Sequence, residues 1–568
     1  MKQQIIKLSM FAAGLWLLAA CSNDSNSTAD SDKQRPVQGL VFSMSEAPYN
    51  DDVDIATRTA APSVIKDTLN MGGVAAEITL ERDNTPVKQP ATRAITSGNH
   101  YTIVAFNAGT AQQAGEVKGY FDASGVFQYE TGGNTLELPA GNYDFVCYTH
   151  QYATRSGNTV NVDLANAGRA FVCRKTNVTV INAKHQEIAF AMKHAGVRVR
   201  TKLLALTAPT GVVGKLGYGA GKVTATAAYD MVTGTFTAST VKNTTAKTQA
   251  QSYDVAGTVH DAVLNDDLAT VTGGSYLDVL PGTKPEDLVY NITAGTVYNA
   301  TLNTNGNRAP KVGAAFAANG AYTLTIKLMP RYLYLFEDGL TGHLGDPGRA
   351  NHVPIAIVYD VTGRRALSLW NANGGAKTRW CAQRYGTNYI QDNDVMFASY
   401  IDAMSPAADQ GKHWTWDASG SKNGTIKADQ PTAYPAFYYA GNFYNSTDLT
   451  SHLNGKPLAA SLNKRGVWYL PAIYDWDEIC LRLGFATKTD PFWYSWKLNM
   501  VNYACIVAGG TQIGSTTSNA FYSASTELST EKSYRLSLSW ILKAFHFRGF
   551  TSKDAVAVNN KVRPVVNY

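Results

Sequence analysis

The sequence predicts a mainly β protein: two antiparallel β-sandwich domains followed by one α+β domain. Short segments of period-two alternation separated by Gly, Pro and Asn turns run from about residue 37 to 330, without a convincing amphipathic helix. The chain has ten tryptophans, and apart from Trp16 all of them lie between Trp370 and Trp540. This uneven distribution indicates a separate C-terminal unit, and a length of 568 residues suits several domains.

Residues 1–20 have the pattern of an export signal. Lys2 and Lys7 are followed by an apolar stretch too short to span a bilayer, and Leu18-Ala19-Ala20-Cys21 places small residues just before a cysteine. This segment resembles the lipobox of bacterial lipoproteins. The resemblance implies cleavage before Cys21 and attachment of fatty acyl chains, palmitate among them, which anchor the precursor to the outer membrane. The alternative is an ordinary secretory signal with an incidental cysteine.

Residues 21–36 are rich in Ser, Asn and Asp, which predicts a polar tether. The net charge of +6 over 568 residues is mild and argues against nucleic acid as a partner. No CxxC motif and no His/Cys metal spacing occurs, so the sequence predicts no metal and no cofactor. One or two disulfides are compatible with export, and their pairing stays open among five cysteines: Cys147, Cys173, Cys381, Cys480 and Cys505.

Residues 37–194 are predicted to form the first sandwich. Its clearest signal is a strand-turn-strand pattern with Leu136 and Leu138, a Pro-Ala-Gly-Asn turn, and then alternating apolar residues from Tyr143 to Cys147. Residues 195–330 are rich in Ala, Thr and Gly and predict a second sandwich. That sandwich ends in a strand with alternating apolar residues from Tyr322 to Leu328.

The order of several loose motifs in residues 37–330 resembles fimbrillin-like pilus subunits. The motifs are GLVFSMS at 39–45, ATRTAAP at 56–62, the hairpin at 136–148 and AFAMKHAGVRVRTKL at 189–203. The resemblance implies two transthyretin-like sandwiches and cleavage by an arginine-specific protease at Arg58-Thr59. Cleavage would remove the strand around Leu40 to Met44 and open a groove for a donor strand of another subunit. Arg35 is a poorer cleavage candidate because a proline follows it.

Residues 331–568 are predicted to form the α+β domain. Val353–Tyr359 and Ala366–Trp370 form two strands around a turn, and Trp476, Ile479, Cys480 and Leu483 share one face of a helix. Alternation from Tyr534 to Trp540 predicts a half-buried strand. The ending KVRPVVNY predicts a strand internal to this domain.

A motif series in the same region resembles a bacterial module with a C-type-lectin-like fold. It consists of Trp468, Leu470, Pro471, Trp476, Tyr522, Ser523, Ser525, Thr526, Glu527, Val562, Arg563 and Pro564. Ala524 departs from a serine that is common there. The carboxylate-bearing sugar motifs of animal C-type lectins are missing, and Gln430-Pro431-Thr432 is the nearest approach. Sugar binding therefore does not follow from the fold.

Three groups of residues contain side chains that could form a chemical site. Asp475, Asp477 and Glu478 are expected on a solvated helix face rather than as an acid/base pair, and Ser523, Ser525, Glu527 and His546 as a structural turn and strand rather than a triad. The third group is Trp414 and Trp416 in HWTWDASGSKNG. This run is either a partly buried loop or an aromatic platform for a glycan or protein, and the two tryptophans are the candidate ligand-binding residues. Trp468 and Trp476 are expected in the core.

These expectations combine into a fimbrial tip or accessory adhesin at the cell surface. The subunit would accept a donor strand by β-strand addition and bind a host or bacterial surface glycan or protein. The chain is expected to offer no free donor strand of its own and therefore to cap a polymer. Two alternatives remain. One is a permanently lipid-anchored surface glycan-binding protein, and the other is an enzyme acting on protein substrates, although the sequence contains no catalytic motif that supports it.

Overall fold

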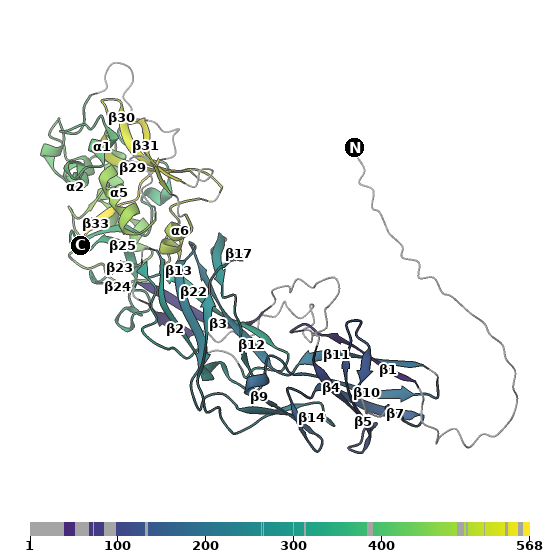
Figure 1. Ribbon diagram of the computed structural model, residues 1–568. Coiled ribbons are helices and arrows are strands. Elements are labelled where there is room, and N and C mark those ends of the chain that lie inside the picture. The colour runs from purple at the N-terminus through teal and green to yellow at the C-terminus, as the bar shows by residue number, and fades with distance from the viewer. Residues whose placement is uncertain are drawn as a thin grey trace, which may run out of the picture.

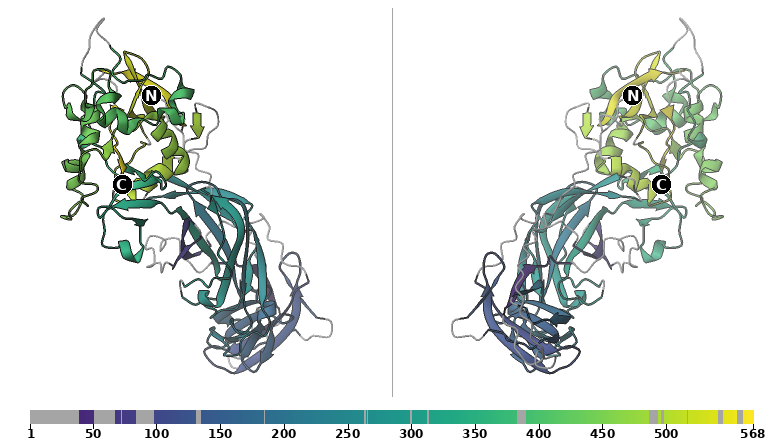
Figure 2. Two further views of the ribbon diagram at one scale, coloured as in Figure 1. Left: turned by 90° about the vertical axis from the view of Figure 1, so that its left-hand side faces the viewer. Right: turned by 90° about the vertical axis from the view of Figure 1, so that its right-hand side faces the viewer.

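The molecule is an elongated array of three parts, with the N-terminal strands at one end and the helix-containing part at the other (Figures 1 and 2). The structure is a computed structural model. It describes residues 39–50, 67–71, 73–83, 98–130, 135–183, 185–262, 264, 266–298, 300–311, 314–382, 390–485, 493–495, 498–515, 517–539, 544–554 and 560–568. The described part is mainly β, as the sequence predicts.

The N-terminal part is a seven-stranded sheet that curls around its own core. Ser43 of the first strand bridges to Val126, which immediately precedes the last strand of the sheet. Leu136 and Leu138 are buried but belong to no strand, so only the second arm of the predicted hairpin is a strand. The strand order is β1 (Leu40–Glu46), β11 (Gln186–His194), β10 (Phe171–Val180), β7 (Gly141–Thr149), β4 (His100–Asn107), β5 (Gln113–Phe121) and β6 (Phe127–Tyr129).

The middle part packs two sheets around a second core. Its larger sheet is centred on β22, which pairs in parallel with β12 and antiparallel with β3. In order, this sheet contains β17 (Val255–Asp261), β18 (Asp266–Thr272), β12 (Val197–Ala205), β22 (Ala321–Pro330), β3 (Val74–Arg82) and β2 (Asp67–Asn70), with β19 (Leu277–Val279) also on β12. The opposing sheet contains β16 (Lys247–Ser252), β13 (Thr210–Tyr218), β20 (Leu288–Val297) and β21 (Ala300–Thr301).

The expected boundary at residue 194 is wrong, because each sandwich contains strands from both sides of this position. Strands β2 and β3 precede most of the first sheet in sequence but pair within the second. A further four-stranded sheet mixes both regions and covers the outer face of the first: β15 (Phe236–Ala238), β14 (Thr226–Asp230), β9 (Thr159–Asp163) and β8 (Thr154–Ser156). The pairing is also not wholly antiparallel, because β1–β11 and β12–β22 are parallel.

The C-terminal part joins two sheets to short helices. One sheet contains β24 (Thr341–His343), β23 (Leu333–Phe336), β25 (Pro354–Asp360), β26 (Arg365–Ser368), β33 (Val565–Asn567) and β27 (Trp468–Tyr469). The other contains β28 (Trp493–Ser495), β31 (Ala544–Ser552), β30 (Lys532–Ser539), β29 (Ala520–Glu527) and β32 (Asn560–Lys561). The helices are α1 (Tyr400–Ala403), α2 (Gly411–Trp416), α3 (Pro435–Gly441), α4 (Thr447–Thr450), α5 (Ile473–Arg482) and α6 (Leu498–Ile506).

Several predicted elements of this part are confirmed. Strands β25 and β26 flank the expected turn, the predicted helix is α5, and β33 lies between β26 and β27 inside its sheet. Trp468 and Trp476 are core residues. Among the described residues, no helix is long and apolar enough to cross a membrane.

Candidate functional site

Strand β1 is the element of the first sandwich that bears most directly on assembly. It pairs in parallel with β11 along its whole length, from Leu40 opposite Gln186 to Glu46 opposite Met192. Alternate residues Leu40, Phe42 and Met44 are buried. The ring centroid of Phe42 lies 6.0 Å from those of Phe127, Phe145 and Phe190, so β1 supplies part of the core as well as a sheet edge.

Removal of β1 would therefore expose both an unpaired edge of β11 and an apolar groove. On its other side, the N–H of Met44 donates to the carbonyl oxygen of Gly125 at 3.0 Å, so an incoming strand would find polar partners there as well. Burial of one large apolar side chain is worth about 1.5–3 kcal/mol. A strand that replaced all three buried residues of β1 would bind firmly. The predicted lipidation residue Cys21 and cleavage site Arg58-Thr59 lie outside the described residues.

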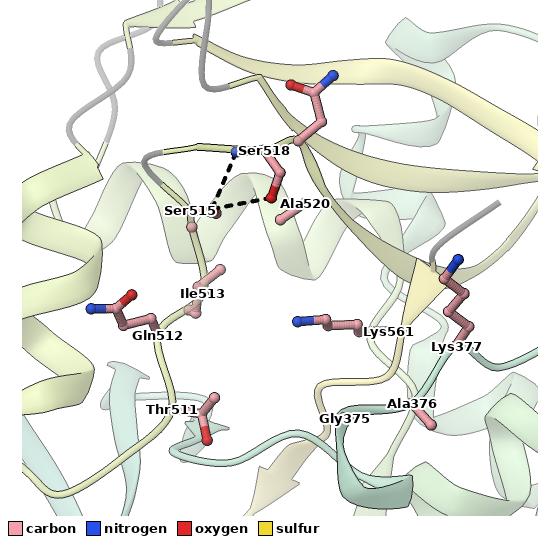
Figure 3. Close-up of a pocket in the computed structure, with 12 residues that line it drawn as sticks. Gly375, Ala376, Lys377, Thr511, Gln512, Ile513, Ser515, Ser518, Ala520 and Lys561 are labelled. Atoms are coloured by element: carbon pink, nitrogen blue, oxygen red, sulfur yellow. Dashed lines mark hydrogen bonds between the residues drawn. The ribbon is translucent and has the colours of Figure 1, made fainter.

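A polar cavity of about 470 Å³ opens on the surface of the C-terminal part (Figure 3). It is bounded by residues 375–377, 511–515 and 518–520, with Lys561 of β32 pointing across it toward Gln512 and Ile513. The Ser518 hydroxyl and N–H lie 3.1 and 3.2 Å from the hydroxyl oxygen of Ser515. Its walls thus present ammonium, hydroxyl and amide groups.

Two residues of the motif series at 468–564, Arg563 and Tyr522, hold one wall of this cavity. The fully buried guanidinium of Arg563 donates to the carbonyl oxygen of Thr511 at 3.0 Å and to those of Ser368 and Leu369 at 2.7 Å. The Tyr522 hydroxyl donates to the carbonyl oxygen of Ile513 at 3.1 Å. These side chains face the interior, so their role is to position backbone rather than to touch a ligand.

A second cavity of about 440 Å³ shares Gly375, Thr511 and Lys561 with the first. The rings of Trp370 and His452 stack beside it, with centroids 4.3 Å apart and planes within 2°. The carboxylate of Asp448 accepts the N–H of Gly374 at 2.8 Å, which fixes the rim. The two cavities adjoin at the three shared residues, and their polar linings suit a ligand rich in hydroxyl or anionic groups. No pattern in the sequence pointed to these cavities, because their residues come from four distant segments.

The predicted aromatic platform at Trp414 and Trp416 is wrong. The Trp414 side chain is fully buried and that of Trp416 is 8% exposed. Their indole N–H groups are also committed, donating to Asp394 Oδ1 at 2.8 Å and to the carbonyl oxygen of Trp468 at 2.5 Å. Both residues lie on α2 and pack into the core, since apolar area of this size gains more from burial than from solvent.

The expectation of a solvated carboxylate face on α5 is also wrong. Asp475 is completely buried and Asp477 is 5% exposed. Asp475 accepts the N–H of Ala472 at 2.8 Å at the start of the helix, the Tyr359 hydroxyl at 2.8 Å and Arg365 at 3.1 Å. Burial, together with the nearby Asp409 charge, raises its pKa to about 6 despite Arg365.

The Ser523, Ser525 and Glu527 side chains of β29 are buried, as a structural strand requires. Glu527 accepts the backbone N–H groups of Asp392 and Asn393 and the ammonium of Lys553, so it is part of an internal network. For the fourth predicted member, His546, the structure describes the backbone of β31 alone.

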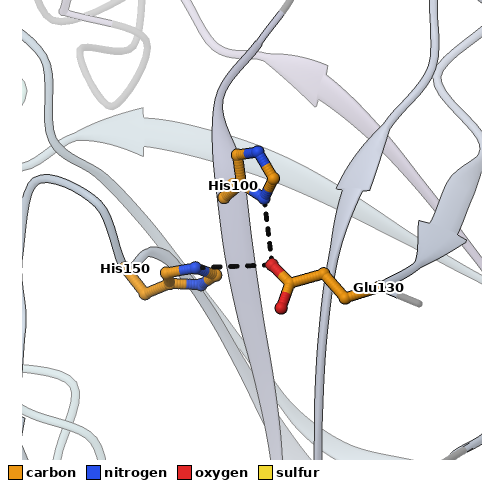
Figure 4. A group of neighbouring side chains, drawn as sticks. All are labelled: His100, Glu130 and His150. Carbon is orange, nitrogen blue, oxygen red and sulfur yellow. Dashed lines mark hydrogen bonds and ion pairs between the residues drawn. The ribbon is translucent and has the colours of Figure 1, made fainter. Parts of the chain in front are cut away.

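One cluster in the first sandwich has the donor set of a divalent cation site (Figure 4). Glu130 Oε1 lies 2.9 Å from His100 Nδ1 and 3.6 Å from His150 Nε2, and the three residues are partly exposed. His150 Nδ1 is 3.0 Å from the Thr102 hydroxyl, which orients the ring. Two imidazoles and one carboxylate suit zinc. The His100–Glu130 hydrogen bond also accounts for the arrangement without a metal.

No family model matches the chain, and no curated protein matches it. Three solved structures that align with it are a "putative cell adhesion protein" from Bacteroides uniformis and fimbrial proteins from Bacteroides vulgatus and Bacteroides ovatus. Their identities are 16%, 15% and 11%, and their TM-scores are 0.27, 0.25 and 0.22. The alignments cover 46%, 40% and 94% of this chain and 93%, 88% and 100% of the respective structures. Each TM-score is below 0.5, so the functional argument rests on the residues of this chain.

Proposed function

We propose that this protein is a fimbrial subunit at the cell surface, exported as a lipoprotein and placed at the tip or in an accessory position. The observation that carries the proposal is β1. It lies upstream of Arg58 in sequence, contributes Leu40, Phe42 and Met44 to the core of the first sandwich, and pairs with β11 at the edge of the sheet. Cleavage at Arg58-Thr59 would break the covalent connection between β1 and the rest of the chain.

The groove left by β1 would accept a strand from another subunit by β-strand addition. We assign the first two sandwiches to the transthyretin-like class and the C-terminal part to the C-type-lectin-like class. Strand β33 is paired on both sides within its own sheet, so this strand is not available for donation. The subunit accepts a strand and presents its C-terminal domain as the adhesive, non-enzymatic end.

A second candidate function is that of a permanently lipid-anchored glycan-binding protein. The two adjoining cavities beside Lys561 favour it, because sugars bind through hydroxyl hydrogen bonds and aromatic faces, and the exposed His452 ring lines one of the two. This candidate keeps Cys21 and β1 in the mature protein, whereas the fimbrial subunit loses both.

The N-terminal sequence of the surface-exposed protein separates the two functions. A start at Thr59 is the expected result, and Arg58→Ala should abolish assembly while the precursor stays folded. A matched Arg35→Ala variant should assemble normally. If assembled protein still begins at Cys21, the donor-strand proposal fails.

Immunogold labelling with an antibody to residues 331–568 tests the position in the polymer. We expect gold particles at fimbrial ends. Label along the whole shaft would identify a stalk subunit, and label confined to the membrane would favour the anchored glycan-binding protein.

A further inference from the structure

The interior of the C-terminal part holds a lysine between two carboxylates. Lys553, in the turn after β31, has a side chain with no exposed area. Its ammonium lies 2.6 Å from Asp392 Oδ2 and 2.6 Å from Glu527 Oε1, and donates to the carbonyl oxygen of Ile390 at 3.0 Å. The side chains of both carboxylates are likewise completely buried.

The surroundings of this triad are largely aromatic. The Lys553 nitrogen lies 5.2 Å from the centre of the Trp380 ring, and Trp380 packs edge-on against Phe437 and Tyr434. Burial raises the pKa of Glu527, although Lys553 and two backbone N–H groups oppose the rise. One ammonium and two carboxylates share a site without solvent, and a proton transfer within the triad would leave fewer separated charges there. A neutral buried amine is a nucleophile.

The two carboxylates are held differently. Glu527 accepts the N–H groups of Asp392 and Asn393 at 3.0 and 2.6 Å, which fix its carboxylate beside the Lys553 nitrogen. Because burial raises its pKa, it is a stronger proton acceptor than an exposed glutamate. Asp392 directs Oδ2 at Lys553, while its Oδ1 accepts the Tyr434 hydroxyl at 2.7 Å. The Tyr434 O–H is therefore placed where negative charge would develop if the Asp392 carbonyl carbon were attacked.

We propose that Lys553 and Asp392 condense into an intramolecular isopeptide bond, with Glu527 as the proton carrier. The Lys553 nitrogen, as the free amine, attacks the carbonyl carbon of protonated Asp392. The new bond joins Nζ to Cγ, and Tyr434 stabilises the oxyanion on Oδ1. Glu527 takes a proton from the nitrogen and delivers it to Oδ2, the Cγ–Oδ2 bond breaks, and water leaves. One amine and one carboxylic acid become one amide and one water, so no oxidant or other reactant is needed.

The competing description is a buried ion pair with fixed charges. Lys427, another fully buried lysine nearby, provides an internal comparison. Its ammonium donates to the carbonyl oxygen of Gly420 at 3.1 Å and to the Ser421 hydroxyl at 2.6 Å, so its hydrogen bonds go to neutral oxygens. Lys553 instead touches two carboxyl groups at once, and one of them has a hydroxyl donor on its far oxygen.

The bond would join residues 161 positions apart and tie the segment before α1 to the turn after β31. A cross-link over so long a loop restricts the unfolded chain strongly. Under a pulling force, the bond would also prevent residues 393–552 between its two ends from being unfolded. An adhesive domain at the end of a fibre would gain from that property, but the chemistry does not depend on the proposed function.

Peptide mapping of the purified full-length protein is the direct test. Trypsin should yield a branched species in which peptide 385–412 is joined to peptide 549–561, lighter by one water than the sum of the two. Fragmentation should place the link on Asp392 and Lys553 in nearly all chains. Recovery of peptide 385–412 alone, with peptides 549–553 and 554–561 from cleavage after a free Lys553, overturns the proposal, and so does a link to Glu527. This measurement is independent of leader processing and of fimbrial assembly.

Two variants test the proton carrier. Glu527→Gln preserves the shape and should reduce the linked fraction at least tenfold, with an unchanged circular dichroism spectrum. Glu531→Gln, the same exchange at an exposed position of the adjoining turn, should leave the link at the wild-type level. Full linkage in Glu527→Gln would contradict the role assigned to Glu527. Should that variant not fold, Tyr434→Phe should link more slowly after refolding, and a wild-type rate would remove Tyr434 from the mechanism.

Discussion

Asp475 joins four elements of the C-terminal part through one buried carboxylate. It accepts hydrogen bonds from Tyr359 of β25, Arg365 of β26, Tyr469 of β27 and the N–H of Ala472 at the start of α5. Its neighbours Asp409 and Arg365 bring opposite charges to the same place. The residue thus fixes where the helix meets the sheet, and its ionisation is coupled to folding.

The pKa of Asp475, raised by burial from 3.8 to about 6, predicts a pH effect of definite sign. Since the folded protein binds this proton more tightly than the unfolded chain, Asp475 weakens folding as pH rises from about 4 to about 6. The difference is on the order of 3 kcal/mol. Asp475→Asn should therefore gain stability relative to wild type across this window. Urea unfolding of both proteins at pH 4 and pH 7 measures it, and a pH-independent difference would contradict the assignment.

Cys21 carries a second prediction at this scale. Its thiol is the expected acyl acceptor, so Cys21→Ala should abolish incorporation of a labelled fatty acid and leave the precursor mislocalised. Cys147→Ala is a suitable control, because that thiol is buried within β7 and burial raises its pKa well above the usual range. Unchanged labelling of Cys21→Ala would remove the lipoprotein assignment.

The sequence identified residue types better than residue environments. The sequence predicts Trp468 and Trp476 in the core, and both are buried; Trp476 shares one helix face with Ile479 and Cys480. Asp475 and Trp414 were misplaced for one reason: their burial depends on partners far away in sequence. Arg365 lies 110 residues from Asp475, and Asp394 lies 20 residues from Trp414. Spacing within a single segment contains no information on such pairs.

At the scale of elements, β1 illustrates what alternation can and cannot predict. The pattern Leu40, Phe42, Met44 predicts a strand with one buried face, and the structure has it. The partner of β1 and their parallel direction could not be inferred, since β11 lies more than 100 residues later. For the same reason the sequence predicts residues 74–82 in the first sandwich, although β22, the partner of β3, belongs to the second.

Phe42 should dominate the energetics of β1. Phe42→Ala removes a ring that contacts Phe127, Phe145 and Phe190, and should destabilise the uncleaved protein by about 3–5 kcal/mol. Ser45→Ala, on the exposed face of the same strand, should change stability by less than about 0.5 kcal/mol. Thermal unfolding of the precursor distinguishes them. Equal effects of the two substitutions would mean that β1 is not seated in the core in solution.

At the scale of the whole molecule, the three parts are joined by different kinds of contact. The first two sandwiches share strands and a covering sheet, so neither is complete alone. The junction of the middle and C-terminal parts is an apolar contact in which Leu206, Leu268 and Met329 join the core of the C-terminal part. No sheet pairs strands across that junction among the described residues.

Deleting residues 331–568 should therefore leave the first two sandwiches folded as a unit. Their two main cores, one lined by Phe42 and Phe145 and the other by Val199 and Leu324, contain no residue of the deleted region. The cut would expose the apolar side chains of the junction and lower stability modestly, but the groove beside β11 stays intact. The truncated protein should enter fimbriae and lose adhesion.

A matched truncation after residue 194 should instead fail to fold, because it leaves β3 without β22. Circular dichroism measures the folding of both truncated proteins, and an adhesion assay measures their binding. If the longer fragment, residues 1–330, does not fold, the C-terminal part is required for folding of the sandwiches. If it folds and adheres as well as the full chain, the adhesive surface lies in the sandwiches.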